Sequence, residues 1–258
     1  MKIISKKTCL YALIAAGVMT MGTLGFQPTA HAYKAEVYVA GMGGHFAKAT
    51  VEIDPTAKTP IHLKALDKVD IGDNETHPVH DARIDPNNRD MMYWSTYKID
   101  KEAGGPHVGV SSLKSGDIVK DVVAPIPEAG GANTKSLYCG SDQTADYYFP
   151  ITMTSKSYID VYKKSDMKRI ASVFLEGTEA DPGVPYKFYH GVNSPDMKTM
   201  LITVNEADKP HGKPVGKIHL LALDAKALES GEVKLIKRAA IPGNAGTSAG
   251  PAAARGCR

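Results

Sequence analysis

The sequence predicts an all-β protein of the β-propeller type, with about four recognisable four-stranded blade units. Two observations support this fold class. β-branched and alternating stretches, separated by turns rich in Gly, Pro, Asn and Asp, dominate the chain. A unit made of a hydrophobic strand, a turn and a second hydrophobic strand also recurs every 50 to 60 residues or so, roughly the period of propeller blades rather than of helical solenoids. The four copies begin at Ala49, Val108, Ser157 and Gly216.

Residues 1–32 have the pattern of a secretory signal. A positively charged start, an apolar stretch over residues 10–25 and the small-residue cleavage site Ala30-His31-Ala32 follow in this order. The alternative is a membrane anchor, but the apolar run is short for a span and polar residues interrupt it. We therefore expect export to the periplasm, or onward to the cell surface, with cleavage near Ala32 and no spanning segment afterwards.

The charge balance argues against a nucleic-acid partner. The formal net charge of the whole chain is +3, and the signal contains three lysines and no acidic residue: Lys2, Lys6 and Lys7. The chain after cleavage is therefore near neutral, whereas nucleic-acid binding favours a basic surface.

Two cysteines remain after the signal, Cys139 and Cys257. In an oxidising compartment they are either paired or separate, because nothing in the sequence fixes their geometry. The chain has no CxxCH sequence, which excludes covalent attachment of a c-type haem, and no CxxC pair for zinc.

The elements can be assigned in chain order. Eight segments have clear strand patterns, and only residues 224–230 (DAKALES) look helical, over one or two turns. The strand segments are Glu36–Val39, Ala49–Ile53, Met91–Tyr97, Val108–Leu113, Tyr158–Tyr162, Ile170–Leu175, Met200–Val204 and Lys217–Leu223. Turn-forming clusters lie between them, as expected for short antiparallel strands.

Four segments carry a resemblance to a known family. Residues 36–40 (EVYVA) followed by residues 49–55 (ATVEIDP) resemble the YVTN and VSVID strand pair of YVTN-type β-propellers. Residues 80–87 (HDARIDPN) and 190–196 (HGVNSPD) resemble the PHGVAVSPDG segment that opens a blade in that family. The wider group includes haem-binding propellers of nitrite reductases and heavy chains of quinoprotein amine dehydrogenases. The likeness covers residues 35–243 and implies fold more than activity.

The chain departs from this family in two ways. Relatives carry seven or eight blades, so the propeller looks incomplete. The strand that should open the first unit is also lacking, and the Ala/Gly-rich tail over residues 244–258 has no strand pattern that could supply it. We therefore expect a propeller domain over residues 33–243, an irregular tail and an exposed sheet edge.

The histidines are the candidate metal ligands. In the resemblance His80 and His190 open equivalent blades near the central channel, and His45 follows a glycine pair in a loop that could face the same mouth. Converging imidazoles there could hold a metal or a haem iron. The alternative is that each blade-opening histidine forms a hydrogen bond between neighbouring blades.

His77 is a further candidate, because residues 76–81 (THPVHD) place two imidazoles and one carboxylate in a short segment. This composition suits copper or zinc. On an extended strand His77 and His80 would point to opposite faces, so a turn at Pro78 would be needed to bring them together.

Three functions follow from these observations. The first is a non-catalytic exported module that binds a protein partner or a small ligand at the channel mouth. The second is a periplasmic redox protein or the propeller subunit of a redox enzyme, binding haem or copper. The third is a cell-surface structural protein. No GxSxG, HExxH or P-loop sequence marks an enzyme, so the ligand, the cofactor and any catalytic residues stay undefined at this level.

Overall fold

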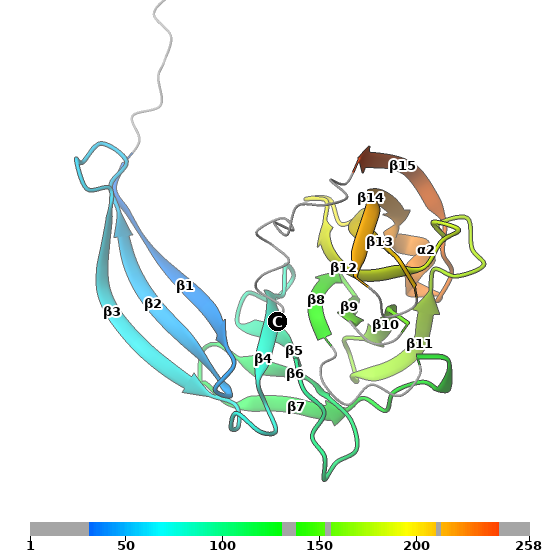
Figure 1. Cartoon of the computed structure of the whole chain (residues 1–258). Helices are drawn as coiled ribbons and strands as arrows, with labels where there is room; N and C mark the ends of the chain where they lie inside the picture. Colours follow the sequence, from blue (N-terminus) through cyan, green and yellow to red (C-terminus); the bar gives the residue numbers. More distant parts are fainter. Residues whose placement is uncertain (1–30, 131–137, 153–155, 210–212, 243–258) are drawn as a thin grey trace, which may run out of the picture. The chain divides into compact units, whose positions relative to one another are not determined.

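The computed structural model describes residues 31–130, 138–152, 156–209 and 213–242. Within these residues the chain is all-β, as predicted: the secondary structure is strand apart from the 3-10 turn η1 (Glu128–Gly130) and the short helix α2 (Ala225–Glu229) (Figure 1). Of the helices in the described residues, none has the length and apolar character needed to cross a membrane.

The strands form one three-stranded sheet and three four-stranded sheets, and consecutive strands are neighbours in each. The first sheet contains β1 (Tyr33–Gly41), β2 (His45–Ile53) and β3 (Ile61–Asp70). The second contains β4 (Val79–Ile84), β5 (Met91–Thr96), β6 (His107–Ser112) and β7 (Ile118–Val123). The third contains β8 (Tyr138–Gln143), β9 (Tyr147–Thr152), β10 (Tyr158–Lys163) and β11 (Lys168–Phe174). The fourth contains β12 (Tyr186–Asn193), β13 (Thr199–Ala207), β14 (Pro214–Asp224) and β15 (Leu235–Pro242).

These sheets are the blades of a β-propeller, formed where the sequence repeat predicts them. Each of the eight predicted strand segments corresponds to a strand, although Tyr97, Leu113 and Leu175 lie one residue past the strand ends, and the predicted helix is α2, with Asp224 as its N-cap. The first sheet begins at β1, and no strand precedes β1 within the described residues.

The first sheet is divided between two compact units. Residues 33–36 and 50–65 belong to one unit, in which Lys64 Nζ pairs with Glu52 Oε2 at 2.6 Å across β2 and β3. Residues 37–49 and the chain from residue 66 onward belong to the second unit. The second unit contains the three four-stranded blades and all the residues considered below.

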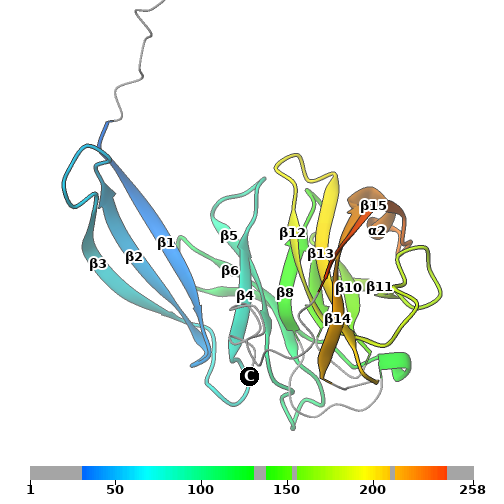
Figure 2. The ribbon, with the colours of Figure 1, turned by 45° about the horizontal axis from the view of Figure 1, so that its top comes forward.

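Within the second unit, the first strands of the three blades lie next to one another. β4 contacts β8, and β8 contacts β12 (Figures 1 and 2). Each blade then runs outward, so its fourth strand is at the far edge. The three inner strands are thus the place where side chains from different blades can meet.

Apolar side chains fill the spaces between sheets in three clusters. One joins the third and fourth blades, one joins the second and third, and one packs β1 and β2 against the second blade. The cluster centres include Ile159 with Leu221, Tyr148 with Val108, and Phe46 with Trp94. Each of these six side chains is buried. Burial of such side chains from both sides of each space is the main stabilising contribution to the blade stack.

A buried lysine also connects the second and third blades. Lys164 Nζ, in the turn between β10 and β11, donates to Asp85 Oδ1 at 3.2 Å and to Gln143 Oε1 at 2.9 Å. It lies 4.9 Å from the centre of the Tyr93 ring. Burial lowers the pKa of Lys164, and the Asp85 carboxylate opposes this shift. Because the ammonium is paired and hydrogen-bonded, its burial between blades is tolerated.

Candidate metal centre

His77 is held in place by a turn that precedes β4. The Asp73 carboxylate accepts hydrogen bonds from the backbone N–H groups of Glu75 and Thr76 and from the Thr76 hydroxyl, and the His77 N–H donates to the Asp73 carbonyl. This is the usual use of Asp at a turn, where a short carboxylate satisfies nearby backbone donors. Gly72 lies beside the His77 ring, and a side chain at that position would overlap the imidazole.

His107 and Asp121 are brought together by strand register. His107 begins β6 opposite Val123, and Asp121 on β7 lies opposite Gly109. The two are therefore diagonal neighbours on one face of the sheet, a spacing that long side chains can bridge. The His107 N–H also donates to Thr96 Oγ1 at 2.8 Å, which fixes the start of β6.

Trp94 forms the inner wall of this region. A side chain at Gly109 would overlap the indole, so the glycine allows Trp94 to lie across β6. The indole N–H donates to Ser111 Oγ at 2.9 Å, and the ring centre lies 5.7 Å from that of His77 in an edge-on arrangement. Trp94 is fully buried and is the only tryptophan of the chain.

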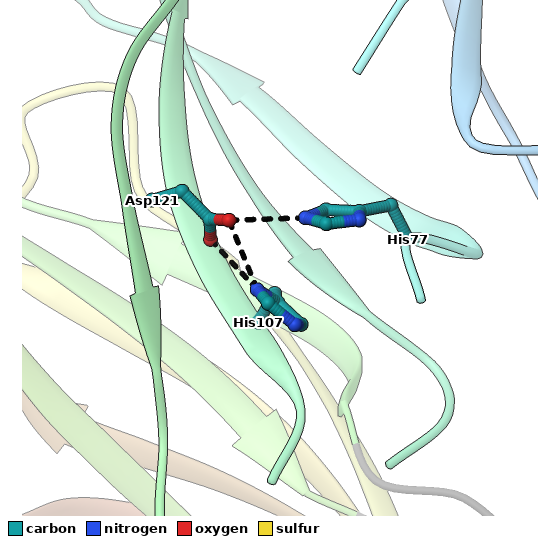
Figure 3. A group of neighbouring side chains, drawn as sticks. All are labelled: His77, His107 and Asp121. Carbon is teal, nitrogen blue, oxygen red and sulfur yellow. Dashed lines mark hydrogen bonds and ion pairs between the residues drawn. The ribbon is translucent and has the colours of Figure 1, made fainter. Parts of the chain in front are cut away.

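The side chains of His77 and His107 converge on the Asp121 carboxylate (Figure 3). His77 Nε2 lies 3.0 Å from Asp121 Oδ2, and His107 Nδ1 lies 2.9 Å from Oδ1 and 3.0 Å from Oδ2. The centres of the two imidazole rings are 4.2 Å apart. Among the described residues, this is the group of at least three His, Cys, Asp or Glu whose donor atoms all lie within 4.8 Å of one another.

The other nitrogen of each imidazole has its own acceptor. His107 Nε2 lies 3.2 Å from Asp100 Oδ2, while Asp100 Oδ1 accepts from the backbone of Glu102 and Ala103. His77 Nδ1 lies 2.8 Å from Thr76 Oγ1, and the Thr76 hydroxyl proton is directed to Asp73. In one tautomer of each ring the outer nitrogen is the N–H donor to this acceptor.

This assignment leaves a lone pair on the inner nitrogen of each neutral ring. Both lone pairs then face a carboxylate at hydrogen-bond distance, which is repulsive unless a cation lies between them. Two protons, one on each ring, satisfy the arrangement. A metal ion bound by both inner nitrogens and by the carboxylate satisfies it equally.

The pKa shifts agree with a strongly coupled set of charges. Burial alone would raise the pKa of Asp121, but hydrogen bonds from His107 and His77 outweigh it and lower this pKa to about 2. Burial alone would lower the pKa of His107, but the hydrogen bonds with Asp121 and Asp100 outweigh it and raise this pKa. The backbone N–H of Ala103 is the main cause that lowers the pKa of Asp100.

The donor set fits a divalent transition metal. Two imidazoles and one carboxylate suit zinc, copper or iron, and ligand atoms around a tetrahedral zinc lie about 3.3 Å apart. The observed separations of 2.9 to 3.0 Å between nitrogen and oxygen need only a small expansion to admit such an ion. The acceptors behind both imidazoles match the supporting contacts that orient metal-bound histidines.

The structure gives the other predicted ligands different surroundings. The His80 ring stacks on Tyr97, with centres 4.8 Å apart. His190 Nε2, on β12, lies 3.6 Å from Cys139 Sγ on β8, so this histidine makes a contact between blades. His45 begins β2 beside Gly41 and Gly43, and its buried Nδ1 has no hydrogen-bond partner within the described structure. His77 and His80 thus have separate neighbours. Cys257 lies outside the described residues.

A second polar group joins the three inner strands. Arg83 on β4 donates to the carbonyls of Ser141 at 2.9 Å and Gly191 at 3.4 Å, which lie on β8 and β12. The Ser141 hydroxyl donates to the Asp81 carboxylate, which lies 3.5 Å from Arg83. Burial raises the pKa of Asp81, although Arg83 opposes the shift. This group connects blades and is distinct from the histidine cluster.

A pocket of about 410 Å³ lies between β1 and β4. Its lining includes His80, a predicted ligand at the channel mouth, and the neighbouring Asp81. Tyr38, Ala82 and Met92 are also among the lining residues. The pocket is therefore a second place where a small ligand could contact a predicted site residue.

The sequence analysis named His77 but missed His107 and Asp121. Neither has a distinctive neighbourhood in the sequence, because one begins a strand and the other lies within the next. The signal that could have found them is the turn over residues 114–117 (KSGD), which fixes the register of the hairpin. Aligning β6 and β7 about that turn would have placed the two side chains on one face.

The comparisons with known proteins concern the fold alone. No protein-family model and no curated protein matches it. A solved structure of U3-55K is similar with a TM-score of 0.38 and 8% identity, over 62% of this chain and 38% of that one. The WD40 repeats of RRP9 give 0.37 and 9%, over 62% and 38%. The β-propeller domain of Cps50 (Swd1) from Myceliophteria thermophila gives 0.42 and 9%, over 80% and 55%. The chain thus spans about 38% to 55% of the length of these propellers.

Proposed function

We propose that this protein is an exported, YVTN-like β-propeller module that binds a divalent transition metal through His77 Nε2, His107 Nδ1 and Asp121. One observation carries the proposal: two imidazole nitrogens face the same carboxylate at 2.9 to 3.0 Å, and the opposite nitrogen of each ring lies at hydrogen-bond distance from an oxygen of Thr76 or Asp100. The signal-like residues 1–32 support export to the periplasm or the cell surface.

The test is metal binding to the purified protein after treatment with a chelator. We expect one equivalent of Zn²⁺ or Cu²⁺ to bind, measured by calorimetry and by elemental analysis. Because Trp94 is the only tryptophan and lies 5.7 Å from His77, Cu²⁺ should also quench its fluorescence at the same stoichiometry. Asp121→Asn and His107→Ala should each weaken binding by more than about 100-fold, since even loss of a supporting contact behind a ligand costs 10- to 100-fold.

A matched control is available on the fourth blade. His219 Nε2 pairs with Glu206 Oε1 at 2.8 Å, and no third metal-binding side chain joins them among the described residues. His219→Ala should therefore keep the metal. Wild-type affinity in a folded Asp121→Asn protein would contradict the proposal, and circular dichroism verifies the folding of each variant.

A second candidate function is ligand binding at the inner strands. The observation that favours it is the pocket between β1 and β4, which places His80 and Asp81 in its lining. A haem or copper site built on His80, His190 and His45 belongs to this candidate, as the redox alternative. An absorption spectrum tests it: a Soret band lost in His80→Ala and His190→Ala proteins would favour haem there.

A further inference from the structure

The three ligands of the proposed metal centre leave one position uncovered. We propose that the bound metal keeps a coordination position open to solvent and that this position takes a neutral donor, such as an imidazole, in preference to an anion. The inference rests on the proposed metal site and adds the chemical class of its exchangeable ligand.

No fourth protein ligand is in reach within the described part of the chain. The donor group has three members, His77, His107 and Asp121. The next polar side chains, Asp100 and Thr76, are hydrogen-bonded to the outer nitrogens of the two rings and therefore lie behind the ligands. Zinc sites with three protein ligands characteristically hold water or an exogenous molecule in the fourth position.

Burial of the surrounding side chains indicates where the open position faces. Trp94 is fully buried behind His77, and the His107 side chain is 8% exposed. Asp121 is the most exposed ligand, at 28%, and His77 follows at 13%. The protein covers the inner side of the cluster, so an added ligand approaches from the solvent side, past the Asp121 carboxylate.

Charge selects the kind of ligand. The Asp121 carboxylate is a direct ligand, the Asp100 carboxylate is bonded to a ligand, and the Asp73 carboxylate accepts from Thr76 behind the other ligand, so carboxylates already offset the charge of a divalent ion. Lys98 Nζ donates to the Asn74 carbonyl and lies 3.8 Å from Glu75 Oε1, so this pair adds no net charge. A further anion would make this half-buried group negative, whereas a neutral imidazole would not.

The experiment uses the intact protein loaded with Co²⁺, whose visible absorption reports a change of ligand. Imidazole should perturb the spectrum with saturation, and azide should bind more weakly. Asp100→Asn removes one negative charge and leaves one acceptor oxygen in place of the two that serve His107 and the backbone N–H groups of Glu102 and Ala103. We expect this variant to bind Co²⁺ about 10- to 100-fold more weakly and, once saturated with Co²⁺, to shift the preference toward azide by about tenfold.

The outcomes separate the two proposals. Failure of Co²⁺ to bind overturns the metal site and the inference together. Binding of Co²⁺ with no response to imidazole or azide overturns only the open position. Tighter azide than imidazole binding in the wild type, or no shift in Asp100→Asn, overturns the selection by charge. Binding of imidazole and of N-acetylhistidine methylamide supports a histidine side chain as the natural donor, and binding of imidazole alone supports a free small molecule.

Discussion

At the scale of single residues, the ionisation of carboxylates differs according to their burial and partners. Asp121 is held ionised by two imidazoles, whereas Asp142 on β8 is 1% exposed and its Oδ2 has no hydrogen-bond partner within the described structure. Burial raises the pKa of Asp142 to about 7. The Asp121 carboxylate is thus ionised beside two imidazoles, whereas the Asp142 carboxylate takes up a proton near neutral pH.

The raised pKa of Asp142 makes stability depend on pH in an unusual direction. Between about pH 4 and pH 7 the unfolded chain has lost this proton and the folded chain retains it, so folding takes up a proton. Stability from this group therefore rises as the pH falls through that window, by roughly 1.4 kcal/mol per pH unit. We therefore expect this group to make the free energy of unfolding in urea higher at pH 5 than at pH 7. Asp142→Asn, which is neutral at both pH values, should lose this contribution to the difference.

The control for this measurement is Asp196→Asn. Asp196 is exposed in a turn, and the hydroxyl of Ser194 is the main cause that lowers its pKa. Its titration therefore lies below the window, and the variant should show the wild-type difference between pH 5 and pH 7. Parallel profiles for Asp142→Asn and the wild type would show that the Asp142 proton is not coupled to folding.

At the scale of elements, the sequence pattern located strands well and strand partners poorly. Alternation and turn residues predicted β5, β6, β13 and β14 because each strand carries its own period of two. Strand β8 (YCGSDQ) was not predicted, because it is buried on both faces and its sequence does not alternate between apolar and polar residues. The candidate site was not predicted for a related reason. His107 and Asp121 meet only through the register between β6 and β7, which neither strand encodes alone.

The helix α2 gives a quantitative test at this scale. The Asp224 carboxylate accepts hydrogen bonds from the backbone N–H groups of Lys226 and Ala227, and the helix places Leu228 in the core. Asp224→Ala should lower the free energy of unfolding by about 1 kcal/mol, because these N–H groups lose their acceptor. Lys234 also pairs with Asp224 at 3.3 Å, so Lys234→Ala serves as the control and should cost less than half as much in urea unfolding.

At the scale of the molecule, the candidate metal centre and the connections between blades are separate systems. All three proposed ligands belong to the second blade and the turn that precedes it, so the centre needs no contribution from other blades. The polar group of Arg83, Asp81 and Ser141 instead joins β4 to β8 and β12. The convergent histidine site therefore lies within one blade.

Arg83 should therefore affect the stability of the three-blade unit without affecting the metal. Arg83→Met removes hydrogen bonds to Ser141 and Gly191 and leaves the buried Asp81 carboxylate with less compensation, at a cost of about 3 kcal/mol in urea unfolding. The double variant Asp81→Asn/Arg83→Met should be less destabilised than Arg83→Met, because it leaves no uncompensated charge. Arg89→Met, at an exposed arginine, should stay within about 0.5 kcal/mol of wild type.

Equal losses of stability in the single and double variants would mean that the ion pair contributes nothing beyond the two backbone contacts. Reduced metal binding in folded Arg83→Met would mean that the metal centre and the connection between blades are coupled.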